Sequence, residues 1–231
     1  MDYSAIFPTD RGYPERLRAV AGGAPLHAIG NTRLLERPGI GICGSRNASE
    51  NALAAAHLVG LEAAKRGLVT VSGYARGVDR LAHKGALEGG GATIAVLPQG
   101  IDSFRIVKEL EPLIDPSENF LAVSTFEPDS VWTSWRAMKR NKVIVGLSLG
   151  LLVIEARERG GTINAALECV RQGKPLWAMA YSSETAGREG NRKLLADAAI
   201  PIRHRRDLSA ALEAALSHPP EEVRQLALNL L

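Results

Sequence analysis

Three stretches of the sequence combine glycine with arginine at points where a strand is expected to lead into a helix. The first is residues 44–47, the second residues 72–79 and the third residues 155–162. Backbone N–H groups in glycine turns and the positive end of a helix dipole both attract anions. A guanidinium group adds a two-pronged phosphate contact. Together the three stretches predict an anion-binding surface, whereas any one of them alone is equally explained as a tight turn with an exposed arginine.

The residues that we expect to form this surface are small, hydroxylated or basic. They are Gly44, Ser45, Arg46, Ser72, Gly73, Arg76, Gly77, Asp79, Arg159, Gly160, Gly161 and Thr162. Two basic clusters, residues 136–142 and 203–206, lie elsewhere in a chain whose formal net charge is only +3. Each cluster is either a solvated helix face or loop, which is the usual fate of such runs, or an addition to the anion-binding surface.

Several other kinds of chemistry are not expected. Residues 39–44 match G-x-G-x-x-G, but a dinucleotide site needs a strand before the first glycine and a helix at the third. Here the glycines fall inside the predicted strand. Ser72, Asp79 and His83 are close in sequence but lack a nucleophile elbow, so we expect them to orient the loop. Without metal-ligand spacing or a Walker A sequence, we expect no catalytic residue, no metal and no cofactor.

The elements that must position the anion-binding stretches alternate between short apolar runs and longer helical patterns. The runs lack strict alternation, which is typical of strands buried on both faces of a parallel sheet. We predict strands at 39–43, 68–72, 93–97, 120–124, 149–154, 176–180 and 200–202. We predict helices at 51–66, 78–88, 105–113, 163–172, 192–198 and 208–217. The fold class is therefore α/β: a Rossmann-like, doubly wound, mostly parallel sheet with helices on both faces, which binds ligands beyond the carboxyl ends of its strands.

Composition and length fit one domain. We expect an N-terminal extension over residues 1–35, the Rossmann-like domain over 36–217 and a C-terminal tail over 218–231. With 45% hydrophobic residues the chain can bury a full core, and the distant Cys43 and Cys169 do not form a disulfide framework. No secretory signal and no apolar run of membrane-spanning length is present, so we expect a cytoplasmic protein without membrane contact.

The motifs, taken in order, resemble the DprA/Smf family of DNA-processing proteins. The matching stretches are residues 41–46, 71–79 with 82–86, 93–97 with 100–102, 139–148, 151–156 and 191–195. The resemblance implies a protein without enzymatic activity that binds single-stranded DNA during natural transformation, helps to load a RecA-type recombinase and forms homodimers. It also adds the basic element Lys139, Arg140 and Asn141 to Ser45, Arg46 and residues 72–79 along the path of the DNA phosphates.

The sequence departs from the family pattern before this basic element. Family members carry an aromatic-proline pair where this chain has Ala137 and Met138. Trp135 and Trp132 either replace that base-stacking surface or belong to the core. Residues 103–119 also differ from the family.

The sequence leaves two other functions open. Residues 159–162 are similar to a turn of the lysine-decarboxylase-like phosphoribohydrolases, for which Glu155 or Glu158 would supply the catalytic carboxylate. Such an enzyme would release a free base from a nucleotide. A sensor or scaffold that binds a small nucleotide and no DNA is the third alternative.

Overall fold

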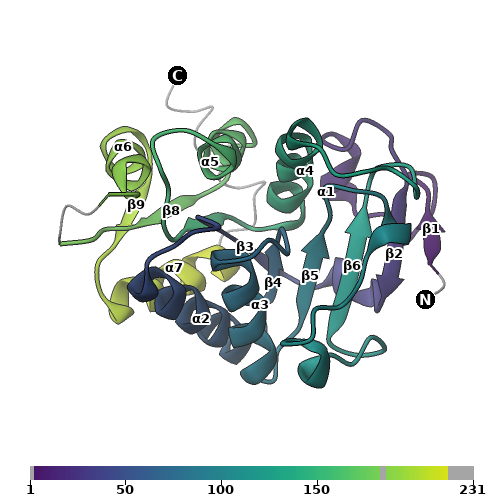
Figure 1. Cartoon of the computed structure of the whole chain (residues 1–231), viewed down its shortest axis with the longest axis horizontal. Helices are drawn as coiled ribbons and strands as arrows, with labels where there is room; N and C mark the ends of the chain where they lie inside the picture. Colours follow the sequence, from purple (N-terminus) through teal and green to yellow (C-terminus); the bar gives the residue numbers. More distant parts are fainter. Residues whose placement is uncertain (1–2, 183–185, 218–231) are drawn as a thin grey trace.

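The computed structural model describes residues 3–182 and 186–217, and within them nine strands form one sheet (Figure 1). The strand order is β1-β2-β6-β5-β4-β3-β7-β8-β9; the pairs from β6 through β9 are parallel, and β1 and β2 pair antiparallel. The strands are β1 (Ser4–Ile6), β2 (Leu26–Gly30), β3 (Gly39–Cys43), β4 (Val69–Ser72), β5 (Thr93–Val96), β6 (Phe120–Ser124), β7 (Leu151–Val153), β8 (Leu176–Met179) and β9 (Ile200–Ile202). This architecture confirms the predicted Rossmann-like α/β class.

Helices cover both faces of the sheet (Figure 1). They are α1 (Glu15–Arg18), α2 (Glu50–Lys65), α3 (Val78–Glu88), α4 (Ser134–Leu147), α5 (Gly161–Arg171), α6 (Glu189–Asp197) and α7 (Arg205–Ser217). Apolar residues of α2, α3 and α7 form one core with Ile40 and Ile42 of β3. Those of α1, α4, α5 and α6 form another with Val69 and Val71 of β4. Strands β3, β4, β5, β6 and β7 are buried along their whole length, as expected for strands covered on both faces, whereas β1 at the edge of the sheet is largely exposed.

Local chemistry fixes the helix ends and the closest helix contact. Ser49 caps α2 by accepting a hydrogen bond from the Ala52 amide (3.4 Å), and α2 stops where Gly67 takes a left-handed φ of +70°. A Cβ on Gly60 of α2 would overlap the Ala82 carbonyl oxygen of α3. Glycine is therefore what allows α2 and α3 to pack with their backbones in contact.

Three parts of the chain differ from the sequence-based predictions. The predicted helix at 105–113 is wrong: this stretch contains turns and the short 3-10 helix η3 (Glu111–Leu113), because Pro112 has no amide hydrogen to donate and disfavours helical backbone at the residue before it. Helix α4 was not predicted as a helix at all. Residues 1–35, expected as an extension, supply β1 and β2, and β2 pairs with β6 inside the sheet. The expected tail, residues 218–231, lies outside the described residues.

The order of the strands creates a crevice at the carboxyl edge of β3. From β3 the chain proceeds through β4, β5 and β6 to one side, and then returns through α4 to place β7, β8 and β9 on the other side. The loops after β3 and β7 therefore lead toward opposite faces of the sheet. Such a switch point is where open α/β sheets bind their ligands.

Candidate functional site

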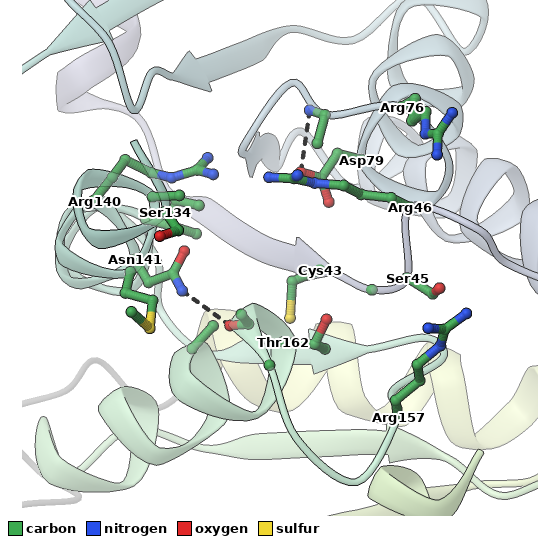
Figure 2. Close-up of a pocket in the computed structure, with 18 of the residues that line it drawn as sticks. Cys43, Ser45, Arg46, Arg76, Asp79, Ser134, Arg140, Asn141, Arg157 and Thr162 are labelled. Atoms are coloured by element: carbon green, nitrogen blue, oxygen red, sulfur yellow. Dashed lines mark hydrogen bonds between the residues drawn. The ribbon is translucent and has the colours of Figure 1, made fainter. Parts of the chain in front are cut away.

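A pocket of about 520 Å³ opens at this switch point. Its walls come from the loops after β3, β4 and β7, from the start of α5, and from α4 (Figure 2). Most of the predicted anion-binding residues line it, namely Gly44, Ser45, Arg46, Arg76, Asp79, Arg140, Asn141, Arg159, Gly160, Gly161 and Thr162. Since β4, β3 and β7 are neighbours in the sheet, the three glycine-arginine stretches meet at one place.

Four exposed arginines surround the mouth of the pocket: Arg46, Arg76, Arg157 and Arg159. Figure 2 shows Arg46 extending across the top of the pocket while Arg157 rises toward Ser45 from the opposite wall. Arg76 donates a hydrogen bond to the Asn47 side-chain oxygen (2.8 Å), which ties the turn after β4 to the turn after β3. The result is a concentration of guanidinium groups around a small concave volume, which suits an anion with several oxygen atoms.

A fifth arginine, Arg140 of α4, is buried at the pocket wall and only 5% exposed. Its Nη1 donates to the Val96 carbonyl oxygen (2.7 Å), and its guanidinium occupies space that a Cβ on Gly73 would fill. Burial lowers the pKa of Arg140 to about 10, and the nearby Asp79 carboxylate opposes that shift. Arg140 therefore remains a cation at neutral pH, and its guanidinium is hydrogen-bonded to β5 rather than exposed to solvent.

Asp79 is the buried carboxylate that faces this cation. Burial raises the pKa of Asp79, while Arg140 and a hydrogen bond from the Ala75 amide (3.3 Å) oppose the rise. Because Asp79 lies in the first turn of α3, it also suits the positive end of that helix dipole. We interpret Asp79 as the counter-charge that offsets the desolvation cost of burying the Arg140 cation, rather than as a ligand for an anion.

The start of α5 supplies backbone donors to the pocket. Gly160 precedes the helix with a φ of +129° and gives no side-chain cap, so the first-turn amides are left for water or a ligand. Asn141 of α4 donates from Nδ2 to the Gly161 carbonyl oxygen (2.9 Å) and to the Asn164 side-chain oxygen (3.0 Å). Figure 2 shows the bond to Gly161. Asn141 thus positions the uncapped helix end beside the arginines.

Four predicted residues do not line this pocket. Ser72 is buried, and its hydroxyl donates to the Ile42 carbonyl oxygen (2.6 Å). Gly77, with a φ of +82°, lets the Ser45 backbone approach α3. Gly73 lies against Arg140 and lines a smaller neighbouring cavity. Lys139 projects over the Trp135 ring, 5.1 Å from its centroid.

The sequence-based prediction also missed residues that line the pocket. Arg157 and Asn47 were inside the predicted stretches but were not chosen, although both are polar and lie directly after a strand. Trp132 and Met138 line the pocket too. Trp132 was considered together with Trp135 as a base-stacking or a core residue but was not placed in the site, and its exposure excludes the core.

Neither carboxylate considered for nucleotide hydrolysis, Glu155 or Glu158, lines the pocket. Glu155 is 3% exposed, accepts hydrogen bonds from the Ser49 amide (3.0 Å) and hydroxyl (2.6 Å), and pairs with Arg188 (3.5 Å). Glu158 is exposed and does not line the pocket. Within the described residues, no cluster of three or more His, Cys, Asp or Glu side chains is arranged to hold a metal, and no helix is long and apolar enough to cross a membrane.

The fold and the pocket define a class: a Rossmann-like α/β protein with an arginine-lined anion pocket at the switch point of its sheet. A family model described as DNA recombination-mediator protein A matches residues 4–213. The chain therefore belongs to the DNA recombination-mediator protein A family, and the resemblance to DprA/Smf proteins seen in the motifs is confirmed.

Known relatives agree with this assignment. The DNA processing protein DprA of Streptococcus pneumoniae is 31% identical over 186 residues, which cover 80% of this chain and 65% of that protein. The chain thus spans less than two thirds of that relative's length. The X-ray structure of the S. pneumoniae protein superposes with a TM-score of 0.81 at 29% identity, covering 91% of this chain and 74% of that one. DNA processing protein A of Helicobacter pylori, for which a single-stranded DNA binding mode is described, shares the fold with a TM-score of 0.77 at 23% identity, covering 93% and 97%.

Proposed function

We propose that this chain binds single-stranded DNA, with phosphates of the sugar-phosphate backbone held in the pocket at the switch point. The observation that carries the proposal is the convergence of Arg46, Arg76, Arg157 and Arg159 on one concave volume beside the uncapped start of α5. Guanidinium groups and backbone amides are the donors that phosphate oxygens accept from. Family membership supplies DNA as the source of the phosphates.

A single strand fits this site better than a duplex. The phosphate-binding groups line a pocket of about 520 Å³ rather than a broad groove, so the backbone must bend into it. A flexible strand can do this, whereas a paired strand is held in its helical path. Phosphate contacts carry no sequence information, so the proposal predicts binding with little sequence preference.

The proposal extends to the role and the partners of the bound complex. It places the chain in DNA processing or recombination in the cytoplasm, as a homodimer that passes the strand to a RecA-type recombinase, with no reaction catalysed. The family description as a recombination mediator supports this role, and the hydrogen bonds that the buried Glu155 accepts from Ser49 support the absence of nucleotide hydrolysis.

The test compares arginine variants inside and outside the pocket. Binding of a fluorescent oligo-dT is followed by polarisation at low salt for the wild type, Arg46→Ala, Arg76→Ala and the control Arg33→Ala. Arg33 is exposed in the 3-10 helix that precedes β3, at the opposite edge of the parallel strands. Each lost charge-assisted contact is worth about 1.5–3 kcal/mol, so each pocket variant should bind about 10- to 150-fold more weakly.

The control variant should bind like the wild type. Absence of binding by the wild type, or an equal loss in Arg33→Ala and the pocket variants, would overturn the proposal. Mononucleotides would then be tested as ligands of the same pocket.

A further inference from the structure

A cluster of four basic residues lies outside the anion pocket. Arg203, His204, Arg205 and Arg206 follow the end of β9 and enter the first turn of α7, and all four are exposed. The sequence alone leaves such a run as either a solvated surface or an element that binds an anion. The contacts of its members distinguish the two.

The stability of α7 does not explain why these residues are basic. The Asp207 carboxylate accepts hydrogen bonds from the backbone amides of Arg203 (2.8 Å) and His204 (2.9 Å), and so caps the start of the helix. An acidic residue suits the positive end of the helix dipole, whereas Arg205 and Arg206 in the same turn oppose it. The two arginines therefore weaken the start of the helix rather than stabilise it.

The neighbouring end of α2 adds two further cations. The side chain of Glu62 is only 7% exposed, and it pairs with Lys65 (3.1 Å), Arg66 (2.8 Å) and Arg205. Hydrogen bonds from Arg66 and Arg205 lower the pKa of Glu62 to about 2, so this carboxylate is ionised at neutral pH. Three cations thus share one buried negative charge, and the contact with Glu62 holds Arg205 against α2.

Two of the arginines are turned to solvent with little compensation. The side chain of Arg206 is 84% exposed, and its ion pair with Asp207 is long (3.7 Å). The side chain of Arg203 forms no ion pair or hydrogen bond within residues 3–182 and 186–217. We call this cluster the α7 basic surface, and it consists of Lys65, Arg66, Arg203, Arg205 and Arg206.

Helix α2 connects the α7 basic surface to the anion pocket. Asn47 lines the pocket and lies two residues before Ser49, which caps the start of α2. Glu62, which contacts Arg205, lies thirteen residues after Ser49 in the same helix. At about 1.5 Å per residue, the two sites are about 20 Å apart along the helix axis. A strand with one phosphate in the pocket spans this distance with several nucleotides.

We propose that the α7 basic surface is a second binding site for the sugar-phosphate backbone, occupied by a strand that already fills the anion pocket. This inference rests on the proposed function and extends it from one pocket to a longer footprint on the strand. Exposed guanidinium groups suit phosphate oxygens. Binding at the pocket raises the effective concentration of the following phosphates at the second site. This tether favours DNA over an acidic protein, which would have to bind the surface unaided.

The length of the strand separates the two sites. Binding of oligo-dT of about 6 and about 20 nucleotides is measured by polarisation for the wild type and two double variants. The test variant is Arg203→Ala/Arg206→Ala, which leaves the ion pairs of Glu62 intact. The control variant is Arg11→Ala/Arg33→Ala, which removes two exposed arginines that belong to neither site.

The test variant should bind the long oligomer about 2- to 30-fold more weakly than the wild type, because it loses two contacts at an exposed surface. Its salt dependence with the long oligomer should be shallower by about 1.4 in slope, since two phosphates are no longer neutralised. The short oligomer reaches only the pocket, so the test variant should bind it like the wild type. The control variant should bind both oligomers like the wild type.

The outcomes distinguish the two proposals. If the wild type binds neither oligomer, the proposed function fails. If the wild type binds both, an unchanged affinity of the test variant for the long oligomer refutes the second site. An equal loss with both oligomers also refutes it, since the effect would then lie in the pocket or in the fold. A loss in the control variant as large as that in the test variant would indicate an effect of net charge alone and would contradict the proposal.

Discussion

The fold should lose stability in mild acid because of one buried histidine. His83 of α3 is fully buried, and its Nδ1 is hydrogen-bonded to the Thr93 hydroxyl. That hydroxyl donates its own proton to the Thr70 carbonyl oxygen (2.8 Å), so its oxygen must accept from His83 Nδ1–H. Nε2 is then the unprotonated nitrogen, and it has no hydrogen-bond partner among the described residues.

A second proton on His83 would therefore create a buried cation without an acceptor. Burial lowers the pKa of His83 from 6.5 to about 3, and the positive charge of Arg140 adds to the shift. Below pH 6.5 the unfolded chain binds a proton that the folded chain rejects, so the free energy of unfolding falls as the pH drops toward 3. At about pH 5 this linkage alone costs about 2 kcal/mol, a value set by the unfolded pKa as long as the folded pKa stays well below 5.

Urea denaturation at about pH 7.5 and about pH 5 measures this loss. The control is His83→Asn, whose amide N–H takes the place of Nδ1–H toward Thr93 but does not titrate. The variant should be less stable at neutral pH, yet its loss on acidification should be smaller than that of the wild type by about 2 kcal/mol. Asp79, whose pKa burial raises, contributes in the opposite direction, since its folded form gains stability on protonation; it is present in both proteins. Equal losses in wild type and variant would refute the reasoning.

Three substitutions test the packing that supports the site. Gly73→Ala places a Cβ on the Arg140 guanidinium, so DNA affinity measured by polarisation should fall about 10-fold or more, and the free energy of unfolding should fall by about 1–3 kcal/mol. An unchanged affinity would contradict the placement of Arg140. Gly60→Ala drives α2 against the Ala82 carbonyl and should cost about 1–3 kcal/mol in urea without altering affinity at constant folded fraction; an unaltered midpoint would contradict the close helix contact. Asn191→Ala removes three hydrogen bonds (2.7–3.0 Å), two of them buried, that join α6 to the segment after β7 and to the end of β8, and should lower stability by about 3 kcal/mol, whereas a loss under about 1 kcal/mol would contradict this role.

The strands around the site were predictable because their signal is local. A strand such as β3 (Gly39–Cys43) is buried on both faces, and its composition shows this directly. The glycine-arginine stretches were visible for the same reason, since each follows its strand within a few residues. Local patterns do not contain the order of the strands. That order makes β4, β3 and β7 neighbours, so the three glycine-arginine stretches form one pocket.

Helix α4 could not be predicted on the same basis. Residues 143–147 form a continuous apolar run that is buried all round, which removes the helical periodicity. The burial of Arg140 depends on the absence of a side chain at Gly73, far away in the sequence. The helix start did carry a signal, because the Thr133 hydroxyl accepts from the Arg136 amide (3.2 Å), and such a cap residue before a basic run favours a helix.

The salt dependence of oligo-dT binding tests the central claim most directly. If Arg46, Arg76, Arg157 and Arg159 each neutralise one phosphate, the logarithm of the association constant should fall linearly with the logarithm of the salt concentration, with a slope of about −2.8. The affinity should then fall about 50-fold between about 50 and about 200 mM salt. The double variant Arg46→Ala/Arg76→Ala should reduce the slope to about −1.4, and Arg33→Ala should leave it unchanged. A slope near zero, or the same slope in the double variant as in the wild type, would contradict a phosphate-binding pocket at the switch point.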